Sequence, residues 1–67
     1  MKKKMTNLPI EELENLEKKY NIMIHVITDV SRGVHDYYYK KRKIDDWIYV
    51  SDNMNELKDC LKKEFEG

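Results

Sequence analysis

The sequence has little of what usually cross-links or connects a small protein. Cys60 is the only cysteine among 67 residues, and there are two glycines and one proline. A lone cysteine excludes an internal disulfide and is typical of a cytosolic protein. So few glycines and prolines leave no flexible linker or low-complexity tract. We expect a single domain, because a chain this short has too much surface for its volume to form two cores.

Long apolar runs are also missing. No stretch reaches the roughly 18 apolar residues that a membrane-spanning helix requires. Met1 to Met5 carries lysines like the start of a signal peptide, but the polar Thr6-Asn7-Leu8-Pro9 follows where an apolar segment is needed. We therefore expect a cytoplasmic protein with neither a signal peptide nor a membrane helix.

The sequence lacks the spacing patterns of catalytic and metal sites. His25 and His35 are the only histidines, and no motif places them beside an acid and a nucleophile. Together with Cys60 they lack the short paired spacing of a zinc site. The two glycines are too far apart to form a phosphate-binding loop. We expect no enzyme activity, no metal, no cofactor and no small-molecule substrate.

Two segments have apolar residues at the spacing of an amphipathic helix. These residues are Leu13, Leu16 and Tyr20 in a segment from Leu8 to Tyr20, and Met54, Leu57, Leu61 and Phe65 near the end of the chain. Asn7 is placed to cap the first helix, and Pro9 suits its first turn. Asn53, followed three residues later by Glu56, resembles a capping box at the start of the second.

Three segments between these helices are rich in β-branched and aromatic residues, as strands are. They are residues 22–28, about 34–41 and 47–50. Ser31-Arg32-Gly33 fits a three-residue hairpin loop with Gly33 in the left-handed conformation. We predict an α+β fold in the order helix, three-stranded antiparallel meander, helix, with both helices on one face of the sheet. This domain spans residues 7–67 and follows a basic N-terminal arm, residues 1–6.

The strand period divides the tyrosines Tyr37, Tyr38 and Tyr39 between the two faces of the sheet. A three-residue loop pairs Ile27 with Tyr37, Val26 with Tyr38 and His25 with Tyr39, and the next turn pairs Tyr39 with Ile48, Tyr38 with Tyr49 and Tyr37 with Val50. We expect the helices to cover Met23, His25, Ile27, Tyr37, Tyr39, Ile48 and Val50. The uncovered side, which we call the open face, then holds Ile22, Ile24, Val26, Tyr38, Lys40, Trp47 and Tyr49. A bulge at Gly33 would shift the register and exchange these assignments.

The open face has two interpretations. An apolar patch with aromatic and cationic residues is typical of a protein interface, which predicts a partner-binding set of Tyr38, Lys40, Trp47 and Tyr49. Alternatively, the face binds nucleic acid: the rings stack on unpaired bases while nearby cations neutralise phosphates. Those cations are Lys40, Lys41, Arg42 and Lys43, with Lys2, Lys3 and Lys4 of the arm.

We favour protein interaction because the formal net charge is zero and both predicted helices are rich in acidic residues. The chain is then a non-enzymatic regulatory or accessory factor that binds a partner protein, or a second copy of itself, through the open face. A homodimer is expected because small domains without disulfides or metals often gain stability by association. Domains this small are often of phage or mobile-element origin.

Overall fold

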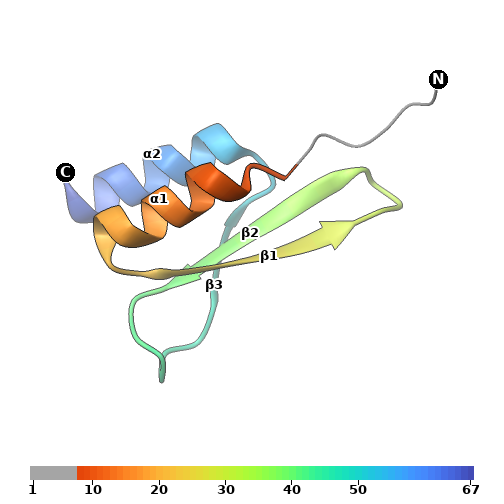
Figure 1. Cartoon of the computed structure of the whole chain (residues 1–67). Helices are drawn as coiled ribbons and strands as arrows, with labels where there is room; N and C mark the ends of the chain where they lie inside the picture. The colour runs from red at the N-terminus through yellow and green to blue at the C-terminus, as the bar shows by residue number, and fades with distance from the viewer. Residues whose placement is uncertain (1–7) are drawn as a thin grey trace.

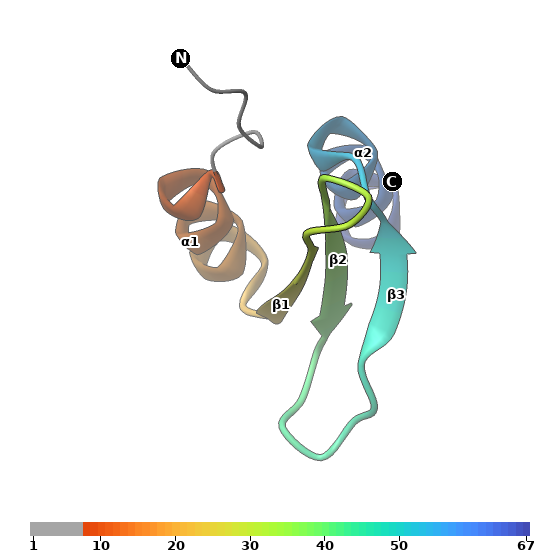
Figure 2. The same ribbon diagram turned by 90° about the vertical axis from the view of Figure 1, so that its right-hand side faces the viewer.

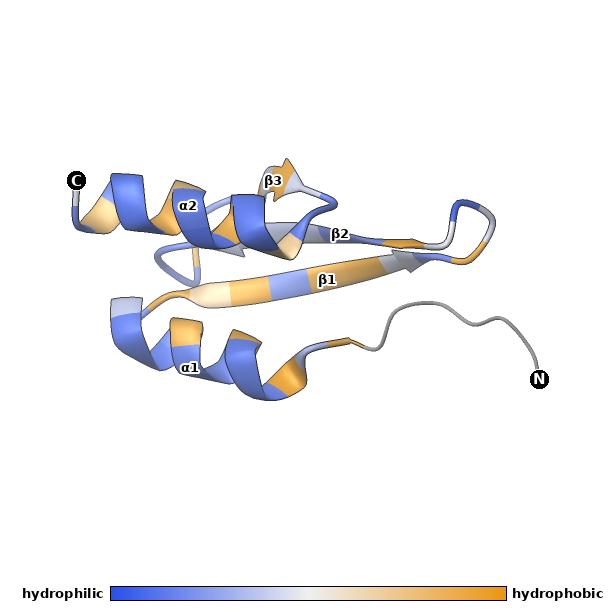
Figure 3. Cartoon of the chain, turned by 90° about the horizontal axis from the view of Figure 1, so that it is seen from above, coloured by the Kyte–Doolittle hydropathy of each residue, from blue (hydrophilic) through white to orange (hydrophobic). Residues whose placement is uncertain are grey.

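The computed structural model describes residues 8–67. The basic arm and Asn7 lie outside these residues. The elements are α1 (Ile10–Tyr20), β1 (Met23–Asp29), β2 (Val34–Lys40), β3 (Ile48–Ser51) and α2 (Met54–Phe65). The strands form one antiparallel sheet in the order β1-β2-β3, and both helices lie on the same side of it (Figures 1 and 3). The predicted α+β architecture is confirmed.

The helix ends show how local polar groups set the boundaries. The first helix begins at Ile10, two residues later than predicted, with Pro9 at its N-cap and no side-chain cap. Asn53 caps α2 as predicted, because its Oδ1 accepts hydrogen bonds from the backbone N–H groups of Asn55 and Glu56. The Glu56 carboxylate does not reach back to Asn53 directly. Instead, the Ser51 hydroxyl donates to Glu56 Oε1 at 2.5 Å and accepts from Asn53 N–H at 3.1 Å.

The hairpin between β1 and β2 has a four-residue loop, 30–33, instead of the three-residue loop predicted from the sequence. Asp29 holds this wider turn. Its carbonyl oxygen accepts the Gly33 N–H at 2.8 Å, and its carboxylate accepts the Ser31 hydroxyl and the Arg32 N–H at 2.8 and 3.2 Å. Gly33 has a φ of +71°, the left-handed conformation expected of it.

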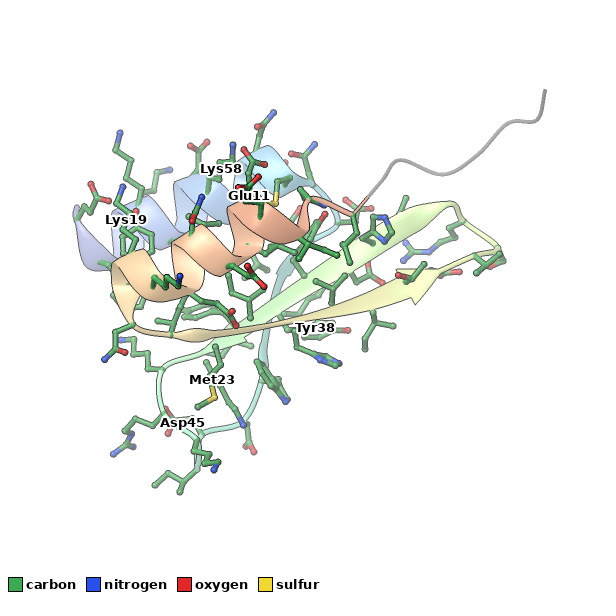
Figure 4. The ribbon with its side chains drawn as sticks, in the orientation of Figure 1. Glu11, Lys19, Met23, Tyr38, Asp45 and Lys58 are labelled. Carbon is green, nitrogen blue, oxygen red and sulfur yellow. The ribbon has the colours of Figure 1, made fainter. Side chains whose placement is uncertain are left out.

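The longer loop shifts the β1–β2 register by one residue and reverses the predicted faces of β1. Val26 pairs with Tyr37, His25 with Tyr38 and Ile24 with Tyr39. The helices therefore cover Ile22, Ile24 and Val26, while Met23, His25 and Ile27 lie on the open face. The prediction that Met23, His25 and Ile27 lie beneath the helices was wrong. Figure 4 shows Met23 and Tyr38 on the side of the sheet away from the helices.

The register between β2 and β3 was predicted more accurately. Tyr39 pairs with Ile48 and Tyr38 with Tyr49, as expected, but Tyr37 pairs with Ser51 because an irregularity in the ladder displaces Val50. Val50 still packs partly against the core. Ile48, expected beneath the helices, is instead 49% exposed, because β3 is the outer strand of the sheet.

The core lies between the helices and the sheet. Its buried side chains are Leu13, Ile22, Tyr37, Tyr39, Leu57 and Leu61. An ion pair between Glu12 and Lys58, at 3.0 Å, connects the two helices near their N-termini. At the opposite end, the rings of Tyr20 and Phe65 stack with centroids 5.2 Å apart. No helix within residues 8–67 is long and apolar enough to cross a membrane.

Candidate functional site

The four residues predicted to bind a partner meet on the open face. Tyr38 and Lys40 come from β2, Tyr49 comes from β3, and Trp47 immediately precedes β3. Tyr38 points away from the helices (Figure 4), and Lys40, two residues further along the same strand, points to the same side. The pairing of Tyr38 with Tyr49 brings β3 alongside. The structure thus places together residues that are separated by the turn at 41–46.

Side-chain contacts hold these residues in a defined arrangement. The rings of Tyr38 and Tyr49 meet edge to face, with centroids 5.3 Å apart. The Lys40 ammonium lies 4.5 Å from the centroid of the Trp47 ring and donates to the Lys43 carbonyl at 3.0 Å. Even so, Trp47 is 41% exposed and Tyr49 is 53% exposed. The rings are therefore ordered by their neighbours while much of their surface remains in water.

His25 completes this site, although the sequence prediction assigned it to the covered face. Its ring centroid lies 5.2 Å from that of Trp47 and 6.2 Å from that of Tyr38. We refer to His25, Tyr38, Trp47 and Tyr49 as the aromatic cluster. The exposed side chain of Ile27 extends it along β1. The sequence feature that could have placed His25 on the open face was the possible register shift at Gly33. A one-residue shift exchanges the faces of all β1 side chains.

A charged group lies at the hairpin end of the open face. Arg32 forms ion pairs with Asp29 at 2.6 Å and with Asp36 at 2.8 Å. The Arg32 guanidinium, helped by the Ser31 hydroxyl, lowers the pKa of Asp29 to about 2. Desolvation, followed by the nearby Asp36 charge, raises the pKa of the Tyr49 hydroxyl. Asp29, Arg32 and Asp36 together carry one excess negative charge. The aromatic cluster thus lies between this group and the Lys40 ammonium at the other end of β2.

The run of cations from Lys40 to Lys43 does not form one continuous surface. Lys41 forms an ion pair with Glu64 of α2 at 3.0 Å, and this hydrogen bond raises the pKa of Lys41. Arg42 pairs with Asp45 inside its own turn at 3.1 Å. Only Lys40 lies over the aromatic cluster, and Lys43 has no ion-pair partner among residues 8–67. Lys2, Lys3 and Lys4 lie outside the described residues.

The other candidate groups are dispersed. His35 pairs with Thr28, which is three residues from His25 on β1. Because successive strand residues point to opposite faces, the two histidines lie on opposite faces of the sheet. Cys60 is on α2 and partly buried. Within the described part of the chain, no group of three or more His, Cys, Asp or Glu side chains could hold a metal ion.

Comparison with protein-family models, with curated proteins and with solved structures finds no match for this chain. No family is therefore assigned to it. The function must therefore be inferred from the surface of the molecule, where the aromatic cluster brings exposed rings from several segments together.

Proposed function

We propose that this chain is a non-enzymatic, cytoplasmic protein-interaction module, a regulatory or accessory factor, that binds a partner protein through the open face. The observation that carries this proposal is the aromatic cluster, in which Trp47 and Tyr49 keep 41% and 53% of their surface exposed. Tryptophan and tyrosine are the residues that most often dominate protein-interface energetics. A contiguous apolar patch of this kind on a small domain usually marks an interaction site.

The exposed rings would contribute a substantial part of the energy that anchors a partner. Covering roughly 100 Å² on each of Trp47 and Tyr49 stabilises a complex by about 2.5 kcal/mol per ring. That gain offsets much of the loss of freedom on association, on the order of 4–15 kcal/mol. Lys40 at one end and the Arg32 group at the other would orient the partner and add little affinity, as charges at the rim of an interface do.

The alternative is a nucleic-acid-binding module that uses the same rings together with Lys40 to Lys43. Its support is weaker because Lys41 and Arg42 are already neutralised by Glu64 and Asp45. Phosphate binding would have to break or share these ion pairs. A protein partner requires no such rearrangement, which is the reason we favour it.

Affinity capture from a lysate of the native host, followed by a binding measurement with the purified captured protein, tests the proposal. Trp47→Ala and Tyr49→Asp should each weaken that binding at least tenfold, because each removes or charges an anchor at the centre of the patch. Val30→Ala is the matched control, since Val30 is exposed but lies at the hairpin tip.

Two outcomes would contradict the proposal. If Trp47→Ala and Tyr49→Asp bind the purified partner as tightly as Val30→Ala does, the open face is not the binding surface. If capture instead disappears on nuclease treatment, and binding to single-stranded nucleic acid weakens steeply as salt rises, the alternative is correct.

A further inference from the structure

We infer that two copies of this chain associate through the outer edge of β3, with the two β3 strands antiparallel across a two-fold axis. The sequence predicted self-association through the open face. The β3 edge is a different surface, and its use would join two sheets side by side and leave both open faces exposed except where the added strand flanks Tyr49. This inference therefore goes beyond the proposed function and does not depend on it.

The two edges of the sheet differ in how far each is obstructed near its helix. On β1, the Ile24 N–H donates to Glu17 Oε2 at 2.8 Å, and α1 lies beside the strand (Figure 3). On β3, no backbone group of Ile48, Tyr49 or Val50 has a hydrogen-bond partner beyond β2 among residues 8–67. Figure 2 shows β3 at the outer side of the sheet. Such an edge is ready to pair with another strand.

The β3 edge is also apolar on both faces. Tyr49 is half exposed on the open face, and Ile48, on the helix-covered face, is 49% exposed. A strand added about 4.8 Å away would bring side chains alongside both residues. Natural edge strands are often protected by charge, proline or short length; β3 is short, but Ile48 to Val50 include neither a charged residue nor a proline.

Charge complementarity supports a copy of the same chain as the source of the second strand. A groove between β3 and α2 is lined by Tyr49, Val50, Glu56, Asp59, Cys60, Lys63 and Glu64. Asp59 and Lys63 have no ion-pair partner in the described part of the chain. A two-fold axis that makes the β3 strands antiparallel also makes the α2 helices antiparallel. Lys63 of one copy then faces the acidic Glu56 and Asp59 of the other.

Light scattering of the full chain across a concentration series tests this inference. We expect a dimer, and we expect Lys63→Glu to raise its dissociation constant about tenfold, because two symmetric attractions become repulsions. Adding Asp59→Lys to Lys63→Glu should return the constant to within about threefold of the original, since opposite charges face each other again. Lys62→Glu is the matched control, because Lys62 is exposed on α2 but does not line the groove.

Cys60 provides an independent measurement because it lines the same groove. A short bis-maleimide should join two copies of the dimer through Cys60, and Cys60→Ser should abolish the product while the dimer persists in light scattering. A chain that stays monomeric at every concentration overturns the inference. So does a dimer that Trp47→Ala dissociates while Lys63→Glu does not, because the second copy then lies on the open face. Far-UV circular dichroism confirms that each variant is folded.

Discussion

Lys40→Met and Trp47→Ala, made singly and together, should reveal a coupling energy of about 0.5–1 kcal/mol in the free energy of unfolding. The Lys40 ammonium lies 4.5 Å from the Trp47 ring centroid, well inside the range of a cation–π contact. Trp47 is 41% exposed, so water screens the contact and places it at the low end of such energies. The hydrogen bond from Lys40 to Lys43 is lost in both the Lys40→Met variant and the double variant, so its energy cancels in the double-mutant cycle.

Urea unfolding followed by far-UV circular dichroism gives the four free energies, and this signal does not depend on the tryptophan that is removed. The coupling is a small part of the total stability, which is roughly 3–10 kcal/mol for a chain of this length. A coupling below about 0.2 kcal/mol would show that the ammonium does not stay over the ring in solution. A coupling above about 2 kcal/mol would show a desolvated pair and would refute the exposure on which the proposed function depends.

Two further predictions concern the core and the hairpin. Leu61→Ala should lower the free energy of unfolding by about 2–5 kcal/mol in the same urea assay, because Leu61 is fully buried; a loss below about 1 kcal/mol would contradict its place in the core. The pKa of Asp29 is lowered to about 2, so its contribution to stability is present above about pH 4 and is lost as the pH falls through about 2. The difference in unfolding free energy between the original chain and Asp29→Asn should therefore shrink over that interval, and a constant difference would exclude this role for the Arg32 contact.

The sequence predicted the order of the elements and the faces of β2, but not the faces of β1. Tyr37 and Tyr39 are buried as expected. Met23 and Ile27 lie on the opposite face from the one predicted, because the hairpin loop is one residue longer than expected. Both alternating sets of β1 are apolar, so the hydrophobic pattern could not select the register. The choice depended on the hydrogen bonds that Asp29 makes to the turn, which hydrophobic periodicity does not report.

The part of the candidate site that depends on the pairing of β2 with β3 could be predicted from the sequence. The parts that depend on the register of β1 or on side-chain partners distant in sequence could not. Tyr38 and Tyr49 were matched correctly because the turn between β2 and β3 has a strong polar signal. His25 was missed because of the register of β1. The dispersal of the basic run was also unpredictable, since the partner of Lys41, Glu64, is distant in sequence and adjacent only after folding.

The hydrogen bond between Glu17 and Ile24 has a consequence for the size of any assembly. A sheet with two open edges can add copies indefinitely and grow into a fibre. Here a side chain of α1 already occupies a backbone group of β1, so a pair joined through β3 would present the same obstructed strand at both ends. A further copy that paired with β1 along Ile24 would have to displace this hydrogen bond. The Glu17 contact would thereby favour a finite complex over an open-ended polymer.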